Sequence, residues 1–419
     1  MTLPLLLLLT LSAAPARAAD AGPLTLADCL RLARAHSTGL ESARLTETGA
    51  LGSVVEARSA LKPQLLAVGQ LTRSDDPATN LPNDNNAVMR LQQSLTPFSP
   101  ASANAARAKA DLDAASYSRR DAELALALQV KTFYHAVVRD QAAQSAVDLV
   151  AAKMRELLDA VLPRFTVGQA PPFDLVKVRS SLADLDRTKD SLSAQLAGER
   201  SRLAQALGMS PDAALTLSPV SLPPPPLPEP ASVSAAAEAS PSLSALARRA
   251  EGADWAASAA RRARLPSLVG TADYGWGGYT TSGMTRGWSL SVGMSLPIFD
   301  WGRIGAAAQR QDAAAKQARV DLEIQRREVR AALIETLAAA RAHAADRGRL
   351  AALSADARDA ARAGVTRYRR GGAGILEATD SLALWLSTML GENAAAHAYL
   401  DDIARVERLA PRSDGDFHE

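Results

Sequence analysis

Apolar residues recur at helical spacing over two unusually long stretches of this chain. A single helical run is predicted from 101 to 162. From Leu126 onward its apolar residues are separated by three or four positions, as along the seam of a coiled coil, with an interruption at Asp140 and Gln144. A helix of that length would extend about 90 Å at ~1.5 Å per residue. A second long helix is predicted from 301 to 368, and shorter ones over 25–61 (with a kink at 36–39), 173–208, 243–264 and 375–410. The pattern predicts a mainly α protein built from long antiparallel coiled-coil helices.

Two pairs of short segments between these helices have strand character, and in the clearest of them apolar and small polar residues alternate strictly. They predict β-hairpins over 64–96 and 267–296. The last segment is the clearest, because Ser or Gly separates each of its apolar residues, which are Trp288, Leu290, Val292, Met294 and Leu296. Such alternation suits a wall between lipid and water, so these five side chains are predicted to face lipid. A sheet in a soluble protein is the alternative interpretation.

The chain contains an internal repeat with an offset of 203 residues. Two helix-breaking tips, 163–177 and 365–380, carry the same pattern: Phe165, Gly168 and Asp174 in the first correspond to Tyr368, Gly371 and Glu377 in the second. The sequence therefore predicts two structural repeats, 19–210 and 239–410, each with a helix, a β-hairpin, a long helix, a tip and a return helix. The Pro-rich segment 211–238 is predicted to be an extended linker, and 411–419 a disordered tail.

The first 18 residues are predicted to be a signal peptide, because an apolar run precedes the small-residue site Ala16-Arg17-Ala18. Cys29 is the only cysteine, so a disulfide within the chain is excluded. A lipid anchor at Cys29 is disfavoured, because Asp28 stands where such sites have a small residue. We expect Cys29 to be a small residue packed inside a helix.

Charge and histidine placement argue against several functions. The 47 basic and 45 acidic residues nearly cancel, so no global field favours a nucleic-acid partner. The five histidines show neither metal-ligand spacing nor catalytic companions. We therefore expect no enzyme activity, no metal and no cofactor.

The acids at the second tip have two interpretations. Glu377 and Asp380 are three residues apart and thus share one face of a helix. They could complement the dipole at the start of that helix, worth ~0.3–1 kcal/mol each. Alternatively, they could form rings of carboxylates around a pore in an oligomer.

Taken together, the doubled aromatic-x-x-Gly tips, the Leu-Thr-Leu start at 24–26, the two hairpins and the repeat resemble the TolC-type outer membrane efflux protein family. The resemblance covers essentially all of the mature chain. It implies a homotrimer in the cell outer membrane, in which each chain gives four strands to a 12-stranded β-barrel and helices to an α-helical tunnel in the periplasm. It also implies the channel-tunnel component of a tripartite efflux pump or a type I secretion system, exporting small molecules or proteins. The implied partners are outer membrane lipid, a periplasmic adaptor (membrane fusion) protein, and an inner membrane transporter of the RND, ABC or MFS type.

The resemblance also suggests roles for residues at the tips. Glu377 and Asp380 match the family's entrance acids, and Asp174 matches an acid that latches neighbouring helices near Tyr368. The other tip and gating positions that match are Phe165, Gly168, Arg369, Arg370 and Gly371. Where the family has a basic residue, five positions after Tyr368, this chain has Ala373, and Arg369 or Arg370 are the candidate replacements.

A periplasmic adaptor, or another coiled-coil scaffold of a transport complex, is the alternative function. An adaptor would carry one helical hairpin flanked by β-rich halves. This chain instead has two helical hairpins and two strand pairs, which favours the channel.

Overall fold

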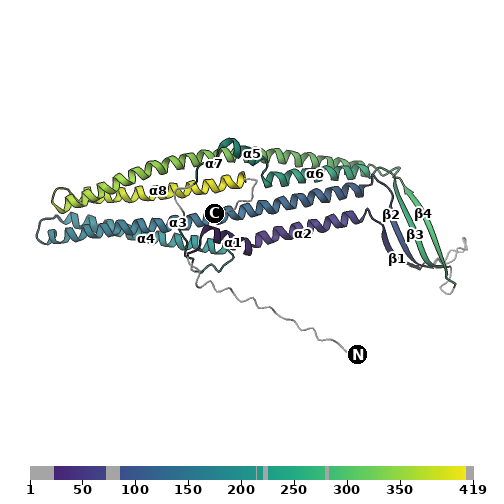
Figure 1. Ribbon diagram of the computed structural model, residues 1–419, viewed down its shortest axis with the longest axis horizontal. Helices are drawn as coiled ribbons and strands as arrows, with labels where there is room; N and C mark the ends of the chain where they lie inside the picture. Colours follow the sequence, from purple (N-terminus) through teal and green to yellow (C-terminus); the bar gives the residue numbers. More distant parts are fainter. Residues whose placement is uncertain (1–22, 72–84, 214, 220–224, 279–282, 412–419) are drawn as a thin grey trace, which may run out of the picture.

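The computed structural model describes residues 23–71, 85–213, 215–219, 225–278 and 283–411. The predicted signal peptide and nearly all of the predicted tail lie outside these ranges, as do most of the loop 73–86 and part of the loop 280–286. The molecule is elongated, with a four-stranded sheet at one end and two helical tips at the other (Figure 1). Within the described ranges, none of the helices is both long and apolar enough to cross a bilayer.

Two helices of 67 residues each, α3 (Pro100–Thr166) and α7 (Arg303–Arg369), run from the sheet to the tips. At the tips the chain turns into two return helices of 35 residues each, α4 (Pro172–Ala206) and α8 (Ile375–Leu409). These end near the middle of the molecule, where α2 (Thr38–Ser59) and α6 (Pro241–Arg262) continue toward the sheet (Figure 1). Between the middle and the sheet, the helices pack in the order α2, α3, α6, α7.

The first predicted helix is two helices rather than one kinked helix. A reciprocal capping box between Thr25 and Asp28 starts α1 (Leu26–His36). Ser37 has an extended backbone, and its side chain accepts a hydrogen bond from the amide of Leu40, which starts α2. The N-cap at Ser37 therefore separates two helices where the sequence predicted one kinked helix.

The largest core cluster joins the two helical hairpins near the tips. It contains Val150, Met154 and Leu157 of α3, together with Leu382 and Trp385 of α8. Small alanines fill much of the remaining interior, which lets helix axes approach closely. The hairpins α3/α4 and α7/α8 therefore hold each other in place.

The prediction of an extended linker over 211–238 is wrong for its last part, which forms α5 (Pro230–Glu238). Proline is compatible with the first position of a helix, where its missing N–H has no intrahelical partner to lose. The Ala-rich residues that follow favour a helix, and Val233 belongs to the same core cluster as Leu333 of α7 and Val406 of α8. Earlier in the same segment, the amide of Ser218 donates to the carbonyl of Leu24 over 3.0 Å, so the segment also holds the start of the chain.

Polar side chains tie α8 to both long helices in the middle of the molecule. His135 of α3 contacts Asp401 over 2.7 Å, and His343 of α7 contacts Asp402 over 2.8 Å. His397 lies beside His135, and burial lowers its pKa to about 4, so it is neutral at pH 7. Two consecutive aspartates thus fix α8 between its neighbours.

The sheet contains β1 (Gln64–Leu71), β2 (Asn85–Ser94), β3 (Ser267–Gly278) and β4 (Thr285–Ser295), antiparallel and in chain order. These bounds agree with the predicted strands to within two residues. The two hairpins join through β2 and β3, where Arg90 pairs with Asp273. β1 and β4 are the edges of the sheet.

Candidate channel surfaces

One face of the sheet is apolar across all four strands. The register places Leu65 beside Leu91 and Tyr274 beside Trp288, and continues the same face along β4. Four of the five residues predicted to face lipid lie on it within β4, and Leu296 directly follows that strand. These side chains are exposed, Trp288 at 79% and Val292 at 65%, because no helix or strand that the structure describes covers them. An uncovered apolar face of this extent indicates contact with something outside the chain.

The opposite face of the sheet is mainly polar from β2 to β4, while β1 adds Leu66 and Val68 to it. Arg90 donates two hydrogen bonds to the Asp273 carboxylate, at 2.8 and 3.0 Å, across the junction of the two hairpins. The hydroxyls of Thr271 and Ser291 lie 2.6 Å apart on the same face. Sequence analysis identified the polar side of the strands but missed the ion pair, because strand order decides which residues meet.

Aromatic side chains lie at both ends of the apolar face. Near the β3–β4 loop, Trp276 and Trp288 are exposed, and the guanidinium of Arg286 lies 4.8 Å from the ring centre of Tyr274. At the other end, the rings of Phe299 and Trp301 pack edge to face. Rings with one apolar and one wet side favour the border between hydrocarbon and water.

The two tips share one backbone design. Gly168 and Gly371 have φ values of 72° and 80°, a left-handed conformation that glycine adopts without steric cost. After each glycine the chain reverses through the same hydrogen bond, from Gln169 to the carbonyl of Arg164 and from Gly372 to that of Arg367. The repeated aromatic-x-x-Gly pattern thus encodes a repeated helix ending.

A buried hydrogen bond joins the two tips. The hydroxyl of Tyr368 donates to the Asp174 carboxylate over 2.9 Å, and the two residues are only 3% and 9% exposed. Burial, together with the adjacent Asp174, raises the pKa of Tyr368 to about 12, so the phenol keeps its proton at neutral pH. We call this contact, with Arg164, the latch.

Arg164 completes the latch and was not found by sequence analysis. It donates to the backbone carbonyl of Tyr368 over 2.7 Å, and its guanidinium lies 5.2 Å from the centre of the Tyr368 ring. The repeat contained a signal, since Arg164 and Arg367 are related by the same offset as Phe165 and Tyr368. Comparing the charged residues of the two tips, in addition to their turn residues, would have identified Arg164.

The candidate replacements for the missing basic residue differ. Arg369 reaches across to Glu156 of α3, with 3.5 Å between guanidinium and carboxylate. The side chain of Arg370 makes no hydrogen bond or ion pair with any residue that the structure describes. The geometry therefore associates Arg369, rather than Arg370, with the contact between the hairpins. Phe165 is partly exposed at the end of α3.

The two candidate entrance acids each have a basic partner. Glu377 accepts a hydrogen bond from Arg367 over 2.7 Å, and Asp380 lies 3.9 Å from Lys177 of α4. Both carboxylates are exposed, so solvent screens these ion pairs. Among the residues described, no three His, Cys, Asp or Glu side chains gather as a metal site would require.

The family model "Outer membrane efflux protein" matches residues 29–209 and 232–410. The outer membrane efflux protein BepC of Brucella suis biovar 1 (strain 1330) is 26% identical over 310 residues, covering 72% of this chain and 67% of that protein.

Three solved structures show the same fold. The outer-membrane channel OprN superimposes with a TM-score of 0.83 at 18% identity, over 92% of this chain and 89% of that one. The CmeC outer membrane channel of Campylobacter jejuni gives 0.81 at 17% identity, over 92% and 85% of the two chains. VceC of Vibrio cholerae gives 0.81 at 16% identity, over 92% and 96%.

Proposed function

Because this chain belongs to the outer membrane efflux protein family, we propose that it is the outer membrane channel-tunnel of a tripartite efflux pump or a type I secretion system. The observation that carries the proposal is the sheet, which has one exposed apolar face, one mainly polar face and, among the residues that the structure describes, two free edges. It is continuous with helices about 100 Å long at ~1.5 Å per residue. Such a chain fits a conduit that crosses both a membrane and an aqueous space, and an adaptor or scaffold needs no such sheet.

The free edges favour association with copies of the same chain. An open strand edge in lipid leaves backbone groups unpaired at several kcal/mol each, and four strands are too few to close on themselves. The helices at the two sides of the layer also carry exposed apolar residues, Leu45 and Leu51 on α2 and Val320 and Ile324 on α7. Three chains joined β4 to β1 and α7 to α2 would give a 12-stranded barrel above a helical tunnel.

In this arrangement the tips form the periplasmic entrance. Within each chain, the latch joins the α3/α4 hairpin to the α7/α8 hairpin. Separating Tyr368 from Asp174 would therefore let the α7/α8 hairpin move outward. We propose that a periplasmic adaptor, bound to an inner membrane transporter of the RND, ABC or MFS type, stabilises that open arrangement.

Cysteine labelling on whole cells tests the orientation. Thr79→Cys, in the β1–β2 loop outside the described residues, should react with a membrane-impermeant maleimide, because that loop would face the cell exterior. Gln169→Cys, at the first tip, should react only after the outer membrane is permeabilised. The single native thiol, Cys29, is buried and should give little background. Labelling of Gln169→Cys but not Thr79→Cys in intact cells would refute this orientation.

Removing the entrance acids should shift ion preference toward anions. Glu377→Gln combined with Asp380→Asn removes six negative charges from a trimer and leaves Arg367 and Lys177 without their partners. We expect the reversal potential in planar bilayers under a KCl gradient to move accordingly, and block by multivalent cations to disappear.

The oligomer should stay intact in this double variant, because amides match carboxylates in volume. Glu335→Gln with Asp356→Asn is the control, since it removes two acids from α7 far from the tip. An equal shift of the reversal potential in both double variants would mean that Glu377 and Asp380 do not set the ion preference and only stabilise the start of α8.

A further inference from the structure

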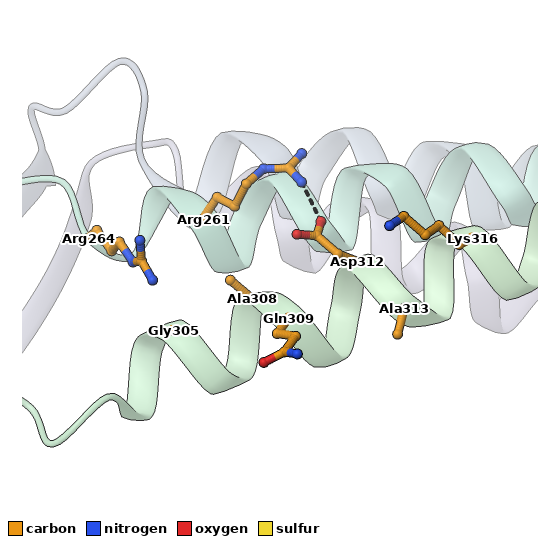
Figure 2. Close-up of a pocket in the computed structure, with 8 residues that line it drawn as sticks. All are labelled: Arg261, Arg264, Gly305, Ala308, Gln309, Asp312, Ala313 and Lys316. Atoms are coloured by element: carbon orange, nitrogen blue, oxygen red, sulfur yellow. Dashed lines mark hydrogen bonds and ion pairs between the residues drawn. The ribbon is translucent and has the colours of Figure 1, made fainter.

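A basic groove lies between α6 and α7, at the end of these helices that is next to the sheet. It has a volume of about 470 Å³ and is lined by eight residues, among them Arg261, Arg264, Gln309, Asp312 and Lys316 (Figure 2). Figure 2 shows the guanidinium of Arg264 and the ammonium of Lys316 at opposite ends of the groove. The groove belongs to neither the tip nor the faces of the sheet.

The positive charge in this groove is not balanced by the part of the chain that the structure describes. Arg261 is paired with Asp312, as the dashed line in Figure 2 marks. Arg264 and Lys316 make no ion pair and no side-chain hydrogen bond with any residue in the described ranges, and Gln309 is likewise without a partner there. Three cations against one carboxylate, with a free amide between them, make a site suited to an anion that accepts hydrogen bonds.

The end of the groove nearest the sheet, where Arg264 and Gly305 lie, is close to where the border of a membrane around the sheet would be. Arg264 precedes the first residue of β3 by three positions, and Gly305, which lines the groove, follows the start of α7 by two. Each headgroup layer of a bilayer is roughly 5–8 Å thick. Arg264 therefore falls at headgroup height if the sheet spans the hydrocarbon, whereas Lys316 lies about 20 Å along α7 from its start.

Exposed apolar side chains lie in the turn that directly precedes α7, four residues or more before Gly305 of the groove. Phe299 and Trp301 are 73% and 90% exposed, and Trp301 has φ of 56°, a left-handed conformation that a bulky residue adopts only at a cost. Asp300 holds this turn by accepting hydrogen bonds from Gly302 and Ile304 over 3.0 and 2.8 Å. A strained turn exposes two rings at the end of the groove where Arg264 lies, so this end can recognise both an apolar and an anionic group.

We propose that this groove binds the phosphodiester headgroup of an anionic phospholipid from the inner leaflet of the outer membrane. Arg264 donates to the phosphate, Gln309 donates to the headgroup, and Phe299 and Trp301 contact the acyl chains. Lys316 lies further along α7 and contributes mainly a positive electrostatic potential that attracts the phosphate. The inference rests on the proposed function, because it requires the sheet to lie in the outer membrane.

Lipid retention by the purified, full-length oligomer tests this site. The protein would be exposed to equal amounts of phosphatidylglycerol and phosphatidylcholine, and bound lipids counted by native mass spectrometry. We expect preferential retention of phosphatidylglycerol. Arg264→Gln should weaken it about tenfold, the loss expected for a charge-assisted hydrogen bond. Lys316→Gln should weaken it less.

Arg310→Gln is the matched control, since Arg310 is an exposed arginine of α7 that does not line the groove. It should retain lipid as the unmodified protein does. No preference for phosphatidylglycerol, or equal losses in Arg264→Gln and Arg310→Gln, would overturn the proposal. Because the same spectra report the oligomer, loss of the lipid site is distinguishable from failure of the proposed channel assembly.

A second arm separates lipid from a soluble anion. Glycerol 3-phosphate carries the phosphate without acyl chains and should displace phosphatidylglycerol only at large excess. Displacement at equal concentrations would show that the groove recognises a soluble phosphate, and would overturn the assignment to a phospholipid.

Discussion

Val292→Arg should prevent assembly of this protein in the outer membrane, whereas Ser291→Arg, one residue away, should be tolerated. Val292 lies in the middle of β4 on the exposed apolar face, and Ser291 lies on the polar face next to Thr271. An arginine on the lipid face near mid-membrane costs roughly 2–4 kcal/mol per site, and a trimer would carry three such sites. On the polar face the same side chain stays in water.

The measurement is recovery of a heat-modifiable oligomer in the outer membrane fraction by semi-native electrophoresis. The two variants add the same charge to the same strand, so each is the control for the other. Equal recovery of both would argue that neither face meets lipid and would favour a soluble sheet, as in the scaffold alternative.

Tyr368→Phe should raise the resting conductance of the closed channel about 5- to 150-fold. The substitution removes one hydroxyl and leaves the buried Asp174 carboxylate without its donor, which costs about 1–3 kcal/mol in the latched state. Each 1.4 kcal/mol shifts an equilibrium tenfold. Single-channel recording in planar bilayers measures the fraction of time spent in the open state.

Tyr399→Phe is the matched control for the latch. The Tyr399 hydroxyl also donates one hydrogen bond, to the carbonyl of Pro225 over 2.7 Å, but it lies in α8 far from the tip. Removing it should leave conductance unchanged. If the two variants conduct alike, the contact between Tyr368 and Asp174 does not hold the entrance closed.

The sequence predicted the strands well because their signals are local. From Trp288 to Met294 of β4 every second residue is apolar, and Pro63 and Pro266 bar the chain from continuing as helix just before β1 and β3. The long helices were equally visible from their spacing. By contrast α5 was missed, since the prolines that precede it outweighed the Ala-rich residues that form it.

The contacts at the tip were predictable only in part. Glycine positions and the acids follow from the repeat, because helix endings depend on residues close in sequence. The partners of those acids do not, since Lys177 and Asp380 belong to different hairpins and meet only through packing. Arg164 could have been identified from the repeat, which relates it to Arg367, but its contact with the carbonyl of Tyr368 depends on packing.

The two halves of the chain match in length as well as in pattern, with 67 residues in both α3 and α7 and 35 in both α4 and α8. A threefold assembly of such a chain would present six hairpins with approximate sixfold symmetry. Neighbouring hairpins would nevertheless alternate in kind, because one tip carries Asp174 where the other carries Glu377. A docking protein that tolerates this difference would bind with a stoichiometry of two per chain, and one that discriminates between the tips would bind one per chain.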